Sequence, residues 1–167
     1  MPIRILATLL GTTLFLCTVA AAKQPKPVEA GVRFPKGYRQ WTHTKSMVIF
    51  SDKHPLFNAL SGIHHIYMNE AAMKAIKTHG PYTDGSVIVF DLLEAGESDG
   101  AYTEGSHKLL AVMQKDGKQF KDTGGWGFQG FKAGDSSQRV VTDPVAQCFN
   151  CHASQKERDF VYSEYTE

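Results

Sequence analysis

The chain is poor in cysteine, in net charge and in long apolar runs. It has three cysteines among 167 residues, and 18 lysines and arginines against 17 aspartates and glutamates give a formal net charge of +1. Because a charge so close to zero creates no strong field, we expect neither nucleic acid nor an anionic membrane surface as a partner. No internal repeat or low-complexity block occurs. The length suffices for one compact domain and is too short for two.

The most apolar stretch lies at the beginning of the chain. A basic start precedes an apolar run, 5–22, which ends in small residues just before Lys23. This pattern predicts a secretory signal peptide over residues 1–22 and therefore export to the periplasm. A membrane anchor is the competing interpretation, but the run is short and interrupted by threonine and glycine, so cleavage is favoured and no membrane span is expected afterwards. Residues 23–33 predict a flexible lead-in, and 34–167 the folded domain.

Two of the three cysteines belong to a motif near the C-terminal end. Cys17 falls inside the predicted signal peptide and is expected to leave with it, whereas Cys148, Cys151 and His152 form a Cys-x-x-Cys-His motif. This spacing is the attachment signature of a c-type haem, because two thiols across a short turn can add to the vinyl groups on one porphyrin edge. The adjacent imidazole is then placed to bind the iron as proximal ligand. We therefore expect one covalently attached haem c per chain, with His152 as its metal ligand.

A Cys-x-x-Cys pair also occurs in redox dithiols and as half of a zinc site. A zinc site needs two further ligands at clustered spacing, and the mature chain has no other cysteine. A dithiol oxidoreductase usually places its pair early, at a strand-to-helix junction near a βαβ pattern, whereas this pair is almost terminal. Haem attachment is therefore the favoured hypothesis.

Hydrophobic patterning predicts an α+β domain. One helix is expected between an Asn69 cap and the Gly80-Pro81 stop, and a second, short helix begins near Pro144 and carries the motif. A polar loop is expected over 94–106. The stretch 38–50 is rich in aromatic and β-branched residues, and a buried strand is predicted at 47–50. Further strands are predicted over 62–68, 86–93, 108–113, 124–131 and 160–165. The fold class is thus predominantly antiparallel β-sheet with one main helix and a short haem-bearing helix.

Two side chains on these strands are candidates for the haem environment. Alternation along the second strand puts His64 and His65 on opposite faces, so only one of them can reach a given pocket. A lone histidine on a strand is more often structural than a ligand. Phe90 lies in the most apolar strand, where ordinary core packing is the default interpretation.

Six segments accompany the haem motif in order along the chain: Tyr38-Arg39-Gln40-Trp41, Gly62-Ile63-His64-His65-Ile66-Tyr67, Asp84-Gly85-Ser86-Val87-Ile88-Val89, Val112-Met113-Gln114-Lys115-Asp116, Gly125-Trp126-Gly127-Phe128 and Phe160-Val161-Tyr162-Ser163. Together with the motif they resemble the cytochrome P-460 family, which includes the β-type cytochromes c prime. The resemblance runs from about Phe34 to Tyr165. It implies a sheet-rich, exported monohaem protein, usually a homodimer, whose iron has one protein ligand and an open distal face.

One position departs from part of that family. Members that oxidise hydroxylamine carry a lysine bonded to the porphyrin edge, and the aligned residue here is Phe90. The β-type cytochromes c prime lack this cross-link, cap the distal iron with phenylalanine and bind small gases such as nitric oxide. The resemblance therefore implies Phe90 at the distal face and His64 where some members have an arginine. Asp143 is the nearest match to the family's proton-handling carboxylate.

Three functions remain open from the sequence. The first is a gas-binding cytochrome whose ligand is nitric oxide or a similar small nitrogenous molecule. The second is an enzyme that oxidises hydroxylamine or nitric oxide, which needs a proton acceptor near the iron. The third is a periplasmic electron carrier with a redox partner, which needs a strong sixth ligand. Met68, Met73, Met113 or one of several histidines could supply such a ligand, although methionines in apolar strands mostly pack in the core.

Overall fold

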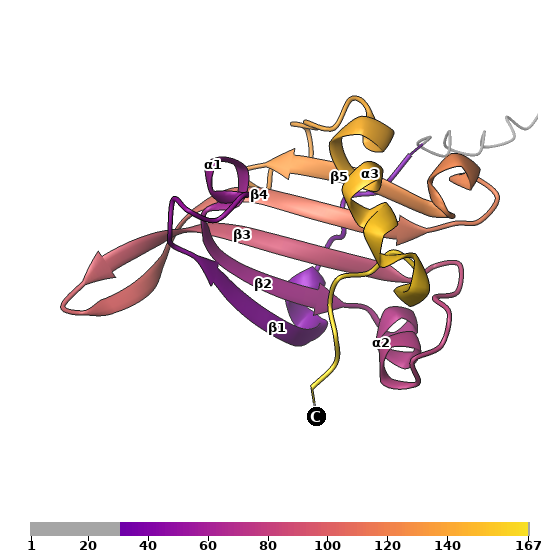
Figure 1. Cartoon of the computed structure of the whole chain (residues 1–167), viewed down its shortest axis with the longest axis horizontal. Coiled ribbons are helices and arrows are strands. Elements are labelled where there is room, and N and C mark those ends of the chain that lie inside the picture. The colour runs from indigo at the N-terminus through magenta and orange to yellow at the C-terminus, as the bar shows by residue number, and fades with distance from the viewer. Residues whose placement is uncertain (1–30, 167) are drawn as a thin grey trace, which may run out of the picture.

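A single five-stranded antiparallel sheet, in the order β1-β2-β3-β4-β5, forms the centre of the fold (Figure 1). The computed structural model describes residues 31–166, so the predicted signal peptide and most of the lead-in lie outside the described part. Each strand pairs with its neighbour in sequence, as expected for a sheet built from successive hairpins. The strands are β1 (Thr42–Ile49), β2 (Gly62–Met68), β3 (Val87–Ser98), β4 (Ala101–Lys115) and β5 (Trp126–Lys132).

Short helices lie around this sheet, which confirms the predicted α+β class. Those before the last strand are η1 (Tyr38–Gln40), α1 (Phe57–Leu60), α2 (Glu70–Lys77) and η2 (Lys121–Thr123). After β5, one turn of π-helix η3 (Val145–Phe149) runs directly into α3 (Asn150–His152) and the 3-10 segment η4 (Ala153–Arg158). We call this continuous run, 145–158, the motif helix, because it carries the Cys-x-x-Cys-His motif. Within residues 31–166, no helix has the length and apolar character needed to cross a membrane.

Both predicted helix starts are confirmed by capping bonds, the first at Asn69 and the second at Asp143. The Asn69 side chain accepts a hydrogen bond from the N–H of Ala72 at 3.0 Å, and a second from the N–H of Val87, which ties the start of α2 to β3. Such a cap satisfies an N–H group that the first helical turn leaves without a partner. One side of α2 is buried, as its apolar stripe predicted, whereas Lys74 and Lys77 are exposed.

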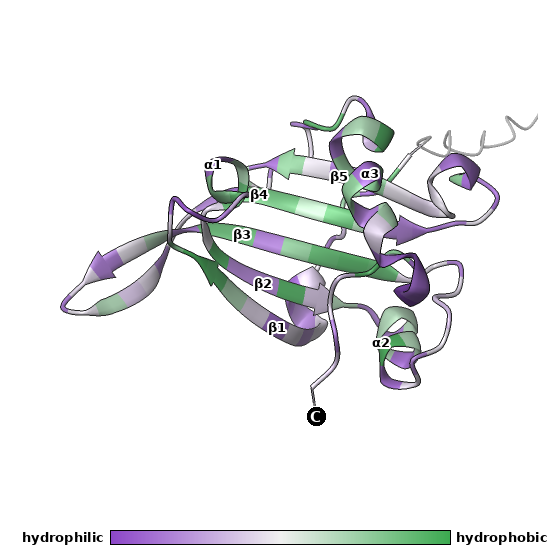
Figure 2. Ribbon diagram, in the orientation of Figure 1, coloured by the Kyte–Doolittle hydropathy of each residue, from purple (hydrophilic) through white to green (hydrophobic). Residues whose placement is uncertain are grey.

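Alternation along the strands divides the core into two layers. On the side covered by α2 and the motif helix, which we call the helix face, Met68, Ile88 and Phe128 pack with the apolar stripe of α2. On the far face, Val89 and Phe131 lie in a second cluster closed by the N-terminal segment. Figure 2 shows that β3 and β4 are hydrophobic over most of the sheet, because both of their sides face one of these layers.

Three predictions about extended segments were wrong. The polar loop expected over 94–106 is the end of a long β3–β4 hairpin, because Asp99 and Gly100, with φ of 52° and 78°, form a tight two-residue turn. The segment 47–50 was expected to be buried, but within β1 only Ile49 is buried, because β1 is an edge strand. No strand covers 160–165, because the chain leaves the motif helix through two residues in the left-handed region and its aromatic residues pack against helices.

Candidate haem site

The two motif cysteines lie three residues apart on the motif helix, so their side chains share one side of it. Both are free thiols: Cys148 is half-buried against the core and Cys151 is exposed. Burial raises the pKa of the Cys148 thiol. A redox dithiol needs a lowered pKa on its attacking cysteine, so this environment disfavours that alternative. Within residues 31–166, no three or more His, Cys, Asp or Glu side chains are arranged to hold a metal ion, which gives no support to a zinc site.

His152 is already oriented in the way that an axial haem ligand requires. Its Nδ1–H donates a hydrogen bond of 2.8 Å to the backbone oxygen of Phe160, and its ring lies 5.0 Å from that of Phe128 and 5.2 Å from that of Tyr162, centroid to centroid. Burial lowers the pKa of His152, which favours the neutral imidazole that binds metals. Since Nδ1 carries the proton, Nε2 is the nitrogen able to bind iron.

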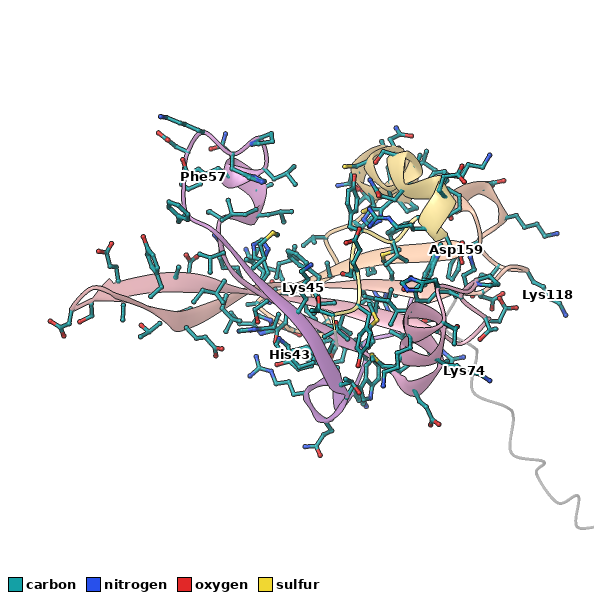
Figure 3. All side chains as sticks on the ribbon, turned by 60° about the horizontal axis from the view of Figure 1, so that its bottom comes forward. His43, Lys45, Phe57, Lys74, Lys118 and Asp159 are labelled. Carbon is teal, nitrogen blue, oxygen red and sulfur yellow. The ribbon has the colours of Figure 1, made fainter. Side chains whose placement is uncertain are left out.

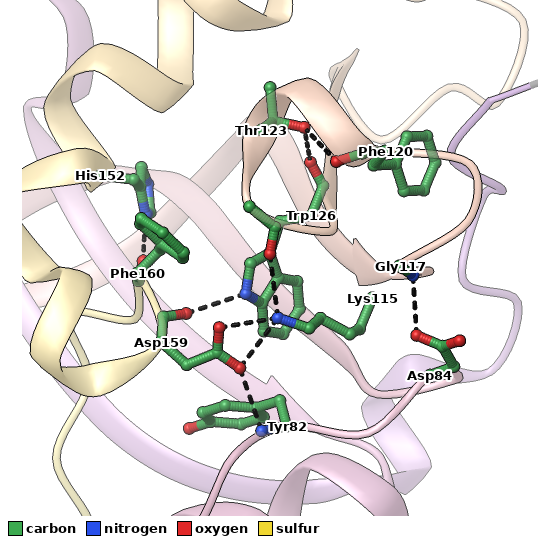
Figure 4. A network of polar contacts seen from close by, with 11 residues as sticks. Tyr82, Asp84, Lys115, Gly117, Phe120, Thr123, Trp126, His152, Asp159 and Phe160 are labelled. Carbon is green, nitrogen blue, oxygen red and sulfur yellow. Dashed lines mark hydrogen bonds and ion pairs between the residues drawn. The ribbon is translucent and has the colours of Figure 1, made fainter.

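The carbonyl that orients His152 belongs to an unusual turn. Asp159 and Phe160 both have positive φ, 50° and 66°, a conformation that costs a residue other than glycine about 1–2 kcal/mol. The side chain of Lys115, at the end of β4, donates to both carboxylate oxygens of Asp159 at 2.7 and 2.9 Å (Figure 4). The indole N–H of Trp126 donates to the Asp159 carbonyl at 2.8 Å. The turn is therefore held from the sheet.

Apolar side chains form a row across the middle of the helix face. Ile66, Phe90 and Ala111 are neighbours in register on β2, β3 and β4, and each is half-buried. Figure 3 shows α1, marked by Phe57, and the end of the motif helix, marked by Asp159, above the same side of the sheet at opposite ends. Such a row would suit one side of a flat apolar cofactor attached to the motif helix. The residues present therefore fit a c-type haem: two free thiols, an imidazole with Nε2 available and an incompletely covered apolar surface.

The structure brings His64 and Phe90 together, with ring centroids 4.5 Å apart. His64 is fully buried, whereas Phe90 is partly exposed, so the phenyl ring forms the surface and the imidazole lies behind it. The Nε2–H of His64 donates to the carbonyl of Leu60 in α1, and burial lowers the pKa of the ring, which keeps it neutral. Its Nδ1 is buried without a hydrogen-bond partner among the described residues. His64 therefore packs against the ring of Phe90.

Asp143 lies at the start of the motif helix and is exposed. One carboxylate oxygen accepts hydrogen bonds from the N–H groups of Val145 and Ala146, both at 3.0 Å. This is the geometry of a helix cap, in which the carboxylate compensates unpaired N–H groups and the positive end of the helix dipole. The cap explains the residue without any role in proton transfer.

A buried carboxylate on the far face was not found from the sequence. The side chain of Asp91 is 1% exposed, and it accepts hydrogen bonds from the Tyr38 hydroxyl at 2.7 Å and the Arg39 guanidinium at 2.9 Å, while His107 faces its other oxygen. Burial raises the pKa of Tyr38 to about 12. The cluster lies across the sheet from the motif helix and ties η1 to the central strand. Its one signal in the sequence was an aspartate inside an otherwise apolar strand.

The comparison with known proteins agrees with this geometry. No curated protein sequence matches the chain. The model of the Cytochrome P460 family matches residues 35–163, a range that contains the motif helix, the apolar row and the turn that orients His152. This match covers most of the chain, and it accords with the fit of the site to haem. The chain belongs to the cytochrome P460 family of haem-binding cytochromes.

Proposed function

We propose that this protein is an exported c-type monohaem cytochrome that binds small nitrogen-oxide ligands, such as nitric oxide, at an open distal face. The observation that carries the proposal is that Phe90 lies at the centre of the half-buried apolar row on the helix face. Phe90 offers a phenyl ring there, with Ile66 and Ala111 beside it, and such a surface neither ligates iron nor accepts a proton. An apolar surface next to the iron excludes water and favours small uncharged ligands over polar ones.

Each part of the site has a distinct role in this proposal. Cys148 and Cys151 would hold the porphyrin by thioether bonds. His152 would offer Nε2 to the iron, while its Nδ1–H stays bonded to the Phe160 carbonyl and fixes the ring plane. Bound haem would supply an iron coordination position for the ligand. Phe90, supported by the ring of His64, narrows the approach to that position.

The ferrous absorption spectrum, recorded with and without nitric oxide, tests this function. We expect a five-coordinate ferrous haem without added ligand, and a new Soret band when nitric oxide binds. A spectrum of six-coordinate low-spin haem that nitric oxide leaves unchanged would instead show a strong sixth ligand, as an electron carrier requires. Of the methionines that could supply one, Met68 and Met73 lie in the core of the helix face, at 1% and 6% exposed, and Met113 is partly buried against the same cluster.

The hydroxylamine-oxidising alternative differs in its covalent chemistry. A lysine cross-link needs an amine at the porphyrin edge. Lys45 is in register with Ile66 of the half-buried row, whereas two other lysines have partners away from the row. Lys115 is bonded to Asp159, and Lys77 lies 5.3 Å from the ring of Tyr165. A tryptic haem peptide that contains only the motif segment supports the gas-binding function. A second linked peptide carrying Lys74, Lys77 or Lys115 would move the protein to the oxidising members.

Export and assembly are tested together by native mass spectrometry. We expect a mature chain that begins at or near Lys23, carries one haem and forms a homodimer. The open edge strand β1 supports the dimer, since Met47 and Val48 are 49% and 38% exposed there and Phe50, just after it, is 69% exposed. A mass that includes Met1, a lipidated Cys17 or a monomer at micromolar concentration would contradict the corresponding part of this expectation.

A further inference from the structure

The ion pair between Lys115 and Asp159 lies where the sheet meets the end of the motif helix. Both side chains are mostly buried, at 12% and 20% exposed. The ammonium of Lys115 has three hydrogen-bond partners: the two carboxylate oxygens of Asp159 and the carbonyl of Gly124 at 3.1 Å. It also lies 5.0 Å from the ring centroid of Trp126. Because all three of these hydrogen bonds hold the ammonium of Lys115, its side chain has one position, and its ion pair holds the carboxylate of Asp159 there as well.

Asp159 is held from three directions. Besides Lys115, its carboxylate accepts the N–H of Tyr82 at 3.0 Å, and its own carbonyl accepts the indole N–H of Trp126. Burial and the nearby Asp159 charge raise the pKa of Tyr82 to about 12. These contacts come from β4, β5 and the segment before β3, so the turn is anchored to the sheet as well as to the motif helix (Figure 4).

The carbonyl that follows this anchor is the one that His152 uses. Phe160 follows Asp159 directly, and its left-handed φ aims its oxygen at His152 Nδ1 at 2.8 Å. A residue other than glycine keeps such a conformation only where its surroundings hold it there. A second contact supports the same conclusion: a Cβ on Gly124 would lie 2.3 Å from the ring of Phe160, so Gly124 gives this ring its space.

We infer that Lys115 and Asp159 are positioning residues for the proximal ligand. Their ion pair holds the Phe160 carbonyl against His152 Nδ1–H and thereby sets the strength of the bond between His152 Nε2 and the iron. A carbonyl that accepts the Nδ1 proton raises the basicity of the opposite nitrogen, and outer groups of this kind tune both metal affinity and electronics. The inference rests on the proposed role of His152 as iron ligand, and the experiment separates the two.

Resonance Raman spectroscopy of the ferrous holoprotein measures the iron–histidine stretching band directly. Two variants remove the ion pair from opposite sides: Asp159→Asn keeps the size of the side chain and deletes its charge, and Lys115→Met keeps the length of the stem. In both we expect the band to shift to lower wavenumber and to broaden, because the carbonyl is no longer held at one distance from Nδ1. Lys115→Arg retains the charge, and we expect it to leave the band closer to that of the wild type.

A second pair on the same strand provides the matched control. Lys108 lies at the middle of β4, where it donates to the carbonyl of Ser61 at 2.7 Å and lies 3.7 Å from Glu94. Lys108→Met and Glu94→Gln remove a lysine–carboxylate pair that has no contact with the turn at Asp159. They should leave the iron–histidine band in place even if they lower the temperature of unfolding. If Lys115 had only a structural role, its variants would behave in the same way, with a lower temperature of unfolding and an unchanged band.

The outcomes distinguish the two hypotheses. A wild-type spectrum with no iron–histidine band would refute the ligation by His152, whatever the variants do. A wild-type band that stays unmoved in a folded Lys115→Met or Asp159→Asn holoprotein would overturn the positioning role and leave the ligation intact. Because the two variants act independently on the same contact, either one that folds, as judged by circular dichroism, decides the question.

Discussion

Replacing both Cys148 and Cys151 by alanine is expected to abolish the haem signal on a denaturing gel. Only the two thioether bonds can keep a porphyrin on an unfolded chain, because every other contact in the site, including the bond from His152 to iron, depends on the fold. Cys148 is half-buried and Cys151 is exposed. Alanine at either position therefore removes few packing contacts, and loss of haem is not explained by loss of the sheet.

The single variants provide the comparison. Cys148→Ala and Cys151→Ala each leave one thiol, and each should retain some haem through denaturation by a single thioether bond. A double variant that still stains for haem after denaturation would show that the attachment lies elsewhere. Circular dichroism of each variant shows whether the strands have formed.

Replacing Phe90 by alanine is expected to speed the binding of nitric oxide to the ferrous protein. The phenyl ring is the largest side chain of the half-buried row, and in the proposed site it would narrow the approach to the iron. Lowering a steric barrier by about 1.4 kcal/mol raises the association rate about tenfold, which we take as the smallest expected effect. The cost in stability should be about 2 kcal/mol, below the roughly 3–5 kcal/mol of a fully buried phenylalanine, because the ring is only half-buried. Stopped-flow spectroscopy measures the association rate and denaturant titration the stability.

Val89→Ala is the matched control for this experiment. Val89 precedes Phe90 on β3 but points to the far face, where it is fully buried. Removing its two methyl groups should cost about 1.5–2 kcal/mol and leave the association rate unchanged. Equal acceleration in both variants would mean that general loosening of the sheet controls ligand entry, and an unaccelerated Phe90→Ala would place the ring away from the ligand path.

Local patterns predicted those parts of the fold that local physics determines. The Asn69 cap, the apolar stripe of α2 and the helix start at Asp143 were all predicted, because each depends on residues within one or two turns. The central strands followed from their apolar runs. The long β3–β4 hairpin was missed because its polar residues hid the Asp99-Gly100 turn signal.

The candidate site was predicted only in part, for a related reason. The motif residues are contiguous in sequence, and His64 and Phe90 were suggested by a family resemblance. The partners of Asp159 and Asp91 could not be predicted, because each contact joins segments far apart in the chain. Lys115 and Asp159 are 44 residues apart, and Tyr38 and Asp91 are 53 apart. The strand predicted over 160–165 was wrong. Its alternating aromatic side chains pack against helices and a turn, and alternation alone does not distinguish this packing from that of a strand.

The order of strands in the sheet also bears on how the chain finds its fold. Every strand pairs with its neighbour in sequence, so each pairing closes a short loop and loses little chain entropy. Folding rates fall as contacts become more distant in sequence, and a meander therefore belongs to the faster antiparallel topologies. Among the described residues, the motif helix comes after all five strands. It packs against a cluster built from β2, β3 and β5, and this cluster requires those strands to be paired. A chain that is released in N-to-C order thus has its whole sheet available before its last segment must dock.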